Sequence, residues 1–218
     1  MSTTLKIDFV SDISCPWCAI GLQSLLRAAE SVRDEVTLDL QFHPYELNPQ
    51  LGPGGHDVAE HLMQKYGMDA AQLAQNQAAI RDRGAELGVT FNMAGRRAYN
   101  TFDAHRLLAW AREQGAALQL ALKQALFVAY FTDGENLADQ DTLVRLAEAV
   151  GLDGEVAREI VAGDRYADIV RNEEAFYQQQ GITAVPAVII NEQYLISGGQ
   201  PVEVFANALQ QIARGDAG

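Results

Sequence analysis

Hydrophobic and polar residues alternate in two segments near the start of the chain. Leu5, Ile7 and Phe9 alternate with polar residues, and residues 36–42 repeat the pattern. A period of two predicts half-buried strands. Between these segments, from Pro16 to Ala29, apolar residues recur at helical spacing. The order strand, helix, strand predicts a parallel pair of strands joined by a right-handed crossover.

The middle of the chain, from about residue 58 to residue 180, has a helical pattern. Asp139 is placed to cap one of its helices, which ends at Gly151. Residues 89–91 carry the one strand signal in this region. Residues 44–55, just before the helical region, contain three prolines and three glycines, which predicts an irregular loop.

The pattern changes back to strands after Gly181. Residues 187–190 and 193–196 predict two strands, with a turn at residues 191–192 between them. Pro201 then opens a last amphipathic helix. The whole order is β-α-β, a helical block, and β-β-α, which predicts an α/β fold with a large all-helical insertion. Residues 1–55 and 181–218 are assigned to one domain, and residues 56–180 to the inserted helical domain.

Composition and charge disfavour several classes of protein, including nucleic-acid-binding and membrane-spanning ones. The chain has 218 residues, 48% of them hydrophobic, which predicts one large domain or one domain carrying an insertion. A net charge of −13 without a run of Lys and Arg disfavours nucleic-acid binding. The chain has no stretch of about eighteen apolar residues, which a membrane span would need. It also has no basic leader before an apolar run, which is the pattern of a secretory signal.

The only two cysteines, Cys15 and Cys18, are three positions apart where the first strand gives way to the first helix. This number excludes a structural disulfide framework and predicts a reducing cytoplasm as the location. Free N–H groups and the helix dipole favour negative charge at a helix start, and the thiolate is the attacking species in disulfide exchange. Cys15 is therefore the predicted nucleophile. Cys18, one turn further on, is predicted to resolve the mixed disulfide.

Half of a zinc site is the first alternative for the cysteine pair. Zinc takes about four ligands, usually two cysteine pairs or a cysteine pair with a histidine pair. The chain has no second cysteine pair, and its four histidines lack zinc-finger spacing. We therefore expect no metal. A pair of buried structural cysteines is the second alternative.

Several motifs occur together in an order that resembles the DsbA family of thioredoxin folds, and within it the FrnE-like branch. The resemblance covers nearly the whole chain. The motifs are Ser11-Asp12-x-x-Cys15-Pro16-Trp17-Cys18-x-x-Gly21, Glu46-Leu47-Asn48-Pro49, Asn100-Thr101-x-x-Ala104-His105-Arg106, Gly181-Ile182-x-x-Val185-Pro186 and Ile196-Ser197-Gly198-Gly199-Gln200.

The resemblance implies a thioredoxin-like fold and a set of site residues. It implies that Val185-Pro186 is a cis-proline turn facing the cysteines, with the Val185 backbone pairing with the substrate. Further residues are expected to bind substrate: Trp17, Asn48, Ser197, His105 and Arg106. An ordinary trans proline, and structural roles for Trp17, His105 and Arg106, are the alternatives. Asp12 is a candidate proton acceptor.

Two functions remain after this comparison. The first is a cytoplasmic dithiol–disulfide oxidoreductase or isomerase that acts on a disulfide-containing protein or small molecule and is recycled by a separate reductant. It needs no cofactor besides the Cys15–Cys18 disulfide, although glutathione is a possible co-substrate. The second resembles kappa-class glutathione transferases and 2-hydroxychromene-2-carboxylate isomerases, which carry Ser where this chain has Cys15. In those, residues like Asn48 and Ser197 would hold glutathione.

Overall fold

The centre of the protein is a four-stranded sheet, seen in a computed structural model that describes residues 2–52 and 54–216. The strand order is β2 (Val36–Pro44), β1 (Thr3–Ser11), β5 (Ala187–Ile190) and β6 (Tyr194–Ser197). Strands β1 and β2 are parallel, whereas β5 runs antiparallel to both β1 and β6. The predicted β-α-β and β-β-α units are confirmed, and they form the thioredoxin-like part of an α/β fold.

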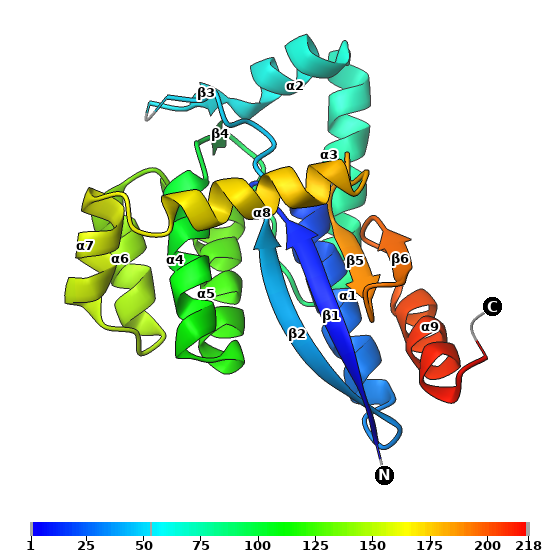
Figure 1. Ribbon diagram of the computed structural model, residues 1–218. Coiled ribbons are helices and arrows are strands. Elements are labelled where there is room, and N and C mark those ends of the chain that lie inside the picture. The colour runs from blue at the N-terminus through cyan, green and yellow to red at the C-terminus, as the bar shows by residue number, and fades with distance from the viewer. Residues whose placement is uncertain (1, 53, 217–218) are drawn as a thin grey trace.

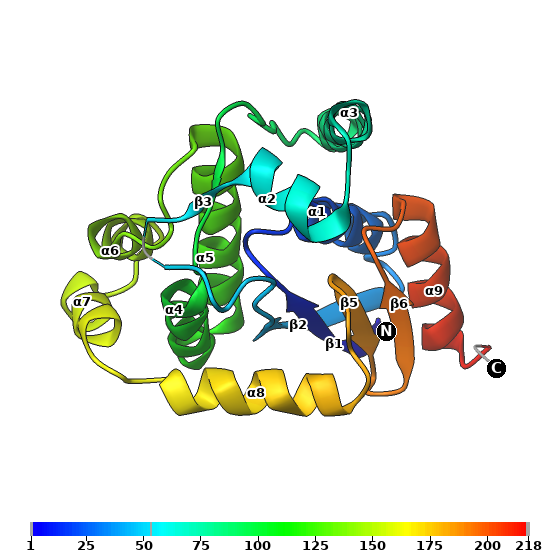
Figure 2. The same ribbon diagram turned by 90° about the horizontal axis from the view of Figure 1, so that it is seen from above.

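Helices cover both faces of this sheet (Figures 1 and 2). Helix α1 (Pro16–Ser31) and helix α9 (Val202–Arg214) pack against each other on one face, and α8 (Ala167–Gln179) lies across the other. The apolar residues of the β1 alternation, such as Ile7 and Phe9, are fully buried. Packing of these side chains against one face of the sheet fixes the register of β1, because a slip by one residue would move all of them to the other face.

The middle of the chain adds further helices beside the sheet: α2 (Val58–Tyr66), α3 (Ala70–Glu86), α4 (Phe102–Gln114), α5 (Ala116–Val128), α6 (Gln140–Ala149) and α7 (Gly154–Ala162). The predicted cap is present, since Asp139 accepts a hydrogen bond from Thr142 N at 2.8 Å. A π-helical turn, Ala129–Asp133, extends α5. Such turns often occur at functional sites.

The strand expected at residues 89–91 is wrong. This segment is irregular, with Phe91 buried and Asn92 N bonded to Phe131 O. A two-stranded sheet of β3 (His56–Asp57) and β4 (Arg97–Ala98) forms elsewhere in the middle region. Strands of two residues are too short to show a period of two, so the sequence pattern missed them.

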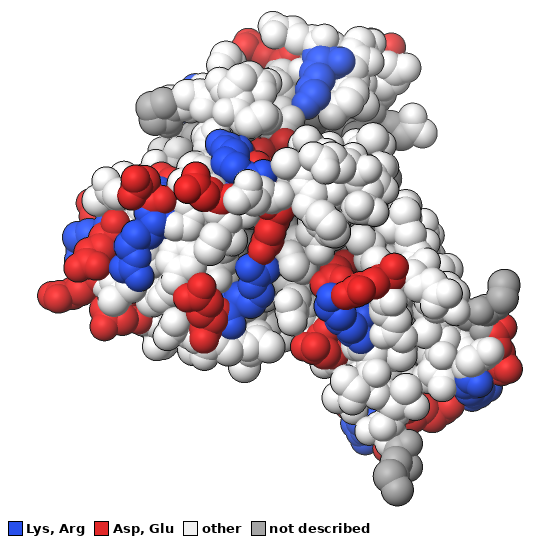
Figure 3. Space-filling model, viewed as in Figure 1, with Lys and Arg blue, Asp and Glu red and all other residues white. Residues whose placement is uncertain are grey.

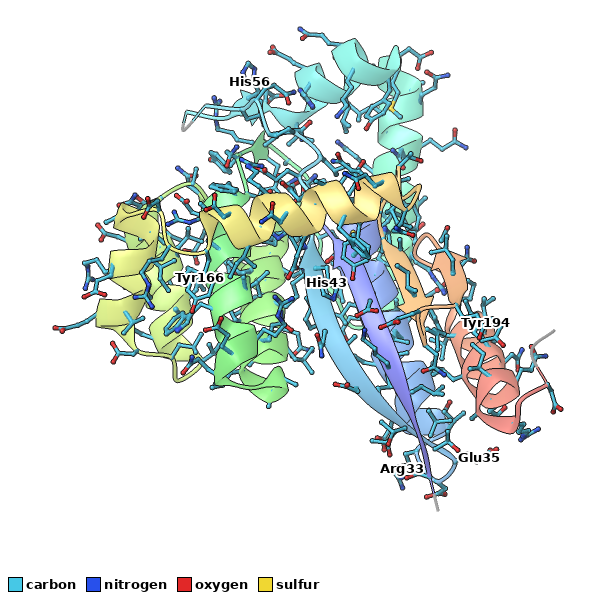
Figure 4. The ribbon with its side chains drawn as sticks, viewed as in Figure 1. Arg33, Glu35, His43, His56, Tyr166 and Tyr194 are labelled. Carbon is cyan, nitrogen blue, oxygen red and sulfur yellow. The ribbon has the colours of Figure 1, made fainter. Side chains whose placement is uncertain are left out.

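Polar side chains join the middle helices to the edge of the main sheet. The buried Gln119 side chain bonds both the N–H and the carbonyl of Phe42 at 3.1 Å, and so pairs with the edge of β2 as a further strand would. Next to it, His43 contacts Asp8 at 3.1 Å and Glu173 of α8 at 2.9 Å. Figure 4 shows His43 where β2 meets the helices. These bonds fix α5 and α8 relative to β2.

Charge is unevenly spread over the surface. On the face shown in Figure 3, acidic side chains gather over α6 and α7. Within the described residues, no helix is both long and apolar enough to cross a membrane.

Candidate active site

The two cysteines lie at the start of α1, as the sequence predicts. Cys15 is the N-cap residue, with φ −91° and ψ 113°, and Pro16 occupies the first helical position. Proline is tolerated there because its missing N–H has no partner within the helix. Both cysteines are free thiols. Cys15 is 5% exposed and Cys18 is fully buried, so only the first can meet a substrate.

The loop before β5 approaches Cys15 from the far end of the chain. The Val185-Pro186 peptide bond is cis. The Cys15 thiol lies 3.7 Å from the Val185 carbonyl oxygen, which accepts its hydrogen bond. A second loop holds this one in place, because Gly198 N donates to Pro186 O at 2.8 Å. The structure thus places Val185 and Pro186 against the start of α1.

Close backbone packing brings the loop after β6 against the cysteine motif. A Cβ atom on Gly199 would stand 2.8 Å from the Trp17 carbonyl oxygen and 3.4 Å from Ile20 Cγ2. Real Cβ atoms do not approach backbone so closely. Only glycine therefore allows this loop to touch the motif.

Replacing Gly199 with alanine is expected to push this loop away from α1. We expect a loss of about 1–3 kcal/mol in the free energy of unfolding and slower attack by Cys15, because the Pro186 loop is bonded to the same segment. Urea denaturation and a single-turnover disulfide assay measure the two effects. Gly52→Ala is the control, since nothing lies within 4 Å of a Cβ there. Equal stability of the two variants would contradict the packing argument.

Asp12 is buried beneath the cysteine motif and organises its backbone. Its carboxylate accepts hydrogen bonds from Ser14 N at 3.2 Å, Ser14 Oγ at 2.8 Å and Leu47 N at 2.7 Å. His105 Nε2 is 3.6 Å from Asp12 Oδ1, beyond hydrogen-bond distance. Burial opposes ionisation of Asp12, yet the neighbouring His105 and the two N–H donors lower its pKa to about 2. We therefore regard Asp12 as a residue that positions the loops; its role as proton acceptor stays a prediction.

Lys123 of α5 adds a cation to the same buried region. Its side chain is fully buried, and its Nζ has no hydrogen-bond partner among the described residues. The ammonium stacks at 5.1 Å from the Phe127 ring and 5.8 Å from the Phe42 ring. Burial lowers the pKa of Lys123 to about 8, against the attraction of Cys18 and Asp12. Burial and the contact with Cys15 raise the pKa of Cys18, and Lys123 opposes that rise.

A cavity of about 460 Å³ opens beside Cys15. The cysteine motif and the cis-proline loop form one side, and α2, α3 and the π-helical turn form the other. Volumes of this size are typical of small-molecule sites. Trp17, Asn48 and Val185 line it, which places three of the predicted substrate-binding residues around one space. Asn48 Oδ1 also accepts a hydrogen bond from Lys65 Nζ at 3.0 Å.

The other predicted binding residues do not line this cavity. Arg106 is 3% exposed and donates to the Asp103 carboxylate. It also donates to the carbonyls of Ile160 in α7 and of Gly163 and Arg165 in the loop after it. The expectation that it faces the active-site groove is therefore wrong, because the last carbonyls of α7 and the loop after it hold its guanidinium. His105, buried behind Asp12, does not reach the groove either.

Ser197 also lies outside the cavity. It is an exposed residue at the end of β6, where it pairs with Ala187. Three residues around the cysteine region could not be recognised from the sequence pattern: Arg96, Lys123 and Tyr130. Their signal is weak in sequence, since each comes from the middle helices or their connections and none belongs to a motif. No group of three or more His, Cys, Asp or Glu side chains within residues 2–52 and 54–216 is arranged to hold a metal ion.

A paired thiol at a helix start, facing a cis-proline loop on a thioredoxin-like sheet, defines the class of thioredoxin-fold thiol proteins. The DSBA-like thioredoxin domain family matches residues 6–210, and the chain belongs to this family. A probable DsbA oxidoreductase from Streptomyces coelicolor has a similar structure, with a TM-score of 0.89 and 33% identity over 98% of this chain and 92% of that one. YwbO of Bacillus subtilis strain 168 is 28% identical over 208 residues, 94% of this chain and 96% of its own length.

Two further structures share the fold at lower identity. The cytosolic disulfide reductase DsbM from Pseudomonas aeruginosa, solved with GSH, has a TM-score of 0.64 and 18% identity, covering 96% of this chain and 99% of that one. A 2-hydroxychromene-2-carboxylate isomerase has a TM-score of 0.68 and 13% identity, covering 97% of each chain. The family supports a thiol–disulfide oxidoreductase or a related isomerase.

Proposed function

We propose that the protein is a dithiol–disulfide oxidoreductase that exchanges disulfides through Cys15 and Cys18. The observation that carries the proposal is the position of Cys15 at the start of α1, with its thiol 3.7 Å from the Val185 carbonyl and Cys18 buried next to it. An extended substrate can pair with the Val185 backbone while its disulfide meets Cys15. The motifs at residues 11–21 and 46–49 favour the FrnE-like branch of the family.

The proposed reaction has two steps. The Cys15 thiolate attacks one sulfur of the substrate disulfide, forms a mixed disulfide and releases the other sulfur as a thiolate. Cys18 then loses its proton and attacks Cys15 Sγ, which releases the second substrate thiol and forms the Cys15–Cys18 disulfide. Two electrons pass from the protein to the substrate, and an external thiol reductant returns them.

We infer that the protein works in the reducing direction, in the cytoplasm. Reduction potentials in this fold range from about −270 to about −120 mV, and the cytosolic poise is near −280 mV. At a potential of about −200 mV, the resting pair would favour the dithiol by more than ~10². The presence of only two cysteines, three positions apart, supports a compartment without structural disulfides.

The alternative is a glutathione-dependent transferase or isomerase, and the cavity beside Cys15 gives it space. Two assays distinguish these functions. Reduction of insulin by the protein with a thiol reductant tests the oxidoreductase, and conjugation of glutathione to 1-chloro-2,4-dinitrobenzene tests the transferase. We expect insulin reduction that is lost in Cys15→Ser, and no conjugation above background. Conjugation that persists in Cys15→Ser, without insulin reduction in the wild type, would overturn the proposal.

A further inference from the structure

The cavity beside Cys15 has a charge opposite to that of the whole protein. The chain carries 29 Asp and Glu against 16 Lys and Arg. None of the described residues that line the cavity is Asp or Glu, whereas Lys65 and Arg96 both line it. A set of residues of this size with the average composition of the chain would contain more carboxylates than cations. The cavity is therefore suited to an anionic ligand.

Of the two cations, Arg96 is expected to contribute more to binding an anion, because it is largely buried without a carboxylate partner. Its guanidinium contacts Met93 Sδ at 3.5 Å and stacks on the rings of Tyr130 at 5.1 Å and Phe131 at 4.8 Å. Its Nε has no hydrogen-bond partner in the part of the chain that the structure describes. Buried charges are usually paired, and no ion pair within the described residues includes this guanidinium, so its charge is left to bind an anionic ligand.

Lys65 is a second cation, at the more exposed side. Its Nζ donates to Leu47 O and Asn48 Oδ1, both at 3.0 Å. Both partners are neutral, so the positive charge of Lys65 is not cancelled by these bonds.

Burial lowers the pKa of Arg96, and Tyr130 and Cys15 oppose that shift. The interaction with Cys15 agrees with a position of Arg96 near the attacking sulfur.

Most of the remaining wall is apolar or aromatic, with neutral polar side chains such as Asn48, Asn76 and Gln77 among it. This composition indicates what the ligand must carry besides its negative charge. The apolar and aromatic side chains come from the cysteine motif, from α2 and α3 and from the π-helical turn. They include Trp17, Leu62, Tyr66, Leu73, Ile80 and Tyr130. Apolar walls bind the body of a ligand, and a few placed polar groups orient it.

We propose that this cavity binds small disulfides that join an aromatic or other apolar body to a carboxylate, with Arg96 holding the carboxylate while Cys15 attacks the disulfide. The inference rests on the proposed function and gives it a substrate class. The reduced pair supplies two electrons, so one molecule of bound disulfide leaves as two thiols and the Cys15–Cys18 disulfide forms. An external thiol then reduces the pair.

The test compares two aromatic disulfides that differ in charge. Reduced protein is mixed at pH 7 with 5,5′-dithiobis(2-nitrobenzoate), which carries carboxylates, or with 4,4′-dithiodipyridine, which is neutral. The second-order rate constant for the carboxylate-bearing disulfide is divided by that for the neutral one, and this ratio is measured in wild type, Arg96→Met and Lys65→Met. We expect the ratio to fall about tenfold in Arg96→Met, as for loss of one charge-assisted contact, and less in Lys65→Met. Arg96→Lys should restore part of it.

Arg81→Met is the matched control, because it removes the same charge from the exposed face of α3, outside the cavity. Its ratio should equal that of the wild type. An equal slowing of both disulfides in Arg96→Met would mean that Arg96 acts only on the Cys15 thiolate or on folding, and would overturn the proposal. Unchanged ratios in both Arg96→Met and Lys65→Met would do the same.

A binding measurement separates this inference from the proposed function. Trp17 lines the cavity, so its fluorescence can report binding of unreactive ligands. We expect tighter binding of naphthalene-2-carboxylate than of naphthalene-2-carboxamide, with the preference lost in Arg96→Met. If the protein reacted with no disulfide, the proposed function would fail while this preference could still hold. Equal binding of the acid and the amide would overturn the inference.

Discussion

Replacing Cys15 with serine is expected to abolish disulfide exchange, whereas replacing Cys18 with serine should leave the first attack intact and trap the mixed disulfide. The reason is their different burial, since Cys15 faces the Val185 carbonyl and Cys18 is fully enclosed. A serine hydroxyl does not attack disulfides at neutral pH. Non-reducing gel electrophoresis and intact-mass measurement of each variant, after exposure to a disulfide substrate, give the result directly.

The two variants serve as controls for each other, because each removes one sulfur from the same helical turn. Cys18→Ser should gain the mass of one substrate half per chain, and Cys15→Ser should gain none. Release of the trapped half by a thiol reductant would identify the bond as a disulfide. If both variants kept the same residual activity, the assignment of attack to Cys15 and resolution to Cys18 would be wrong.

The strands and the position of the cysteine pair were predictable because they depend on short-range patterns. The alternation of Leu5, Ile7 and Phe9 is a local signal, and so is Pro16 at the first position of α1. The position of Pro186 opposite Cys15 was not a local signal. It followed from a resemblance between motifs separated by most of the chain, and the cis bond agrees with it.

The role of Arg106 was not predictable from its neighbours in sequence. Its motif suggested a side chain that reaches the groove. The carbonyls that hold it instead belong to Ile160 of α7 and to Gly163 and Arg165 in the loop that follows. Only the packing of α4 against α7 brings these groups together. Arg96 is the opposite case. It lies in an irregular segment without a motif, yet the structure places it in the wall beside the cysteines.

Lys123 shows how a helical pattern can mislead. The stripe of Leu118, Leu122 and Leu126 predicts one buried face of α5, with Lys123 at its edge. A lysine at such an edge usually extends its ammonium to water. Here the helix is covered by β2 on one side and other helices on the other, so Lys123 is enclosed completely. Enclosure on several sides is a tertiary property that periodicity does not encode.

Replacing Lys123 with methionine is therefore expected to stabilise the protein and to slow the second step of exchange. Folding lowers the pKa of Lys123 from 10.5 to about 8. At about 1.4 kcal/mol for each pKa unit, enclosing the charged form costs about 3 kcal/mol at pH 7. Methionine has a similar length and no charge, so the free energy of unfolding should rise by about 1–3 kcal/mol.

The pH dependence of this gain has a definite sign. Between about pH 8 and pH 10.5, the folded protein binds fewer protons at Lys123 than the unfolded chain does. The stability of the wild type therefore rises with pH across this window, and the penalty is fully present below it. The advantage of Lys123→Met should be largest at pH 7 and should shrink towards pH 10. Urea denaturation of the reduced proteins at several pH values measures it, with the more exposed Lys65→Met as the control.

The kinetic effect of the same substitution should be largest after the mixed disulfide has formed. The positive charge of Lys123 favours the thiolate of Cys18, whose pKa burial raises. Without that charge, Cys18 should ionise less readily and release the second substrate thiol several-fold more slowly. The first attack by Cys15, which interacts with Lys123 more weakly than Cys18 does, should slow less. Single-turnover kinetics with a chromogenic disulfide resolve the two releases. A variant that was less stable at pH 7, or that slowed both releases equally, would show that Lys123 instead serves the packing of α5.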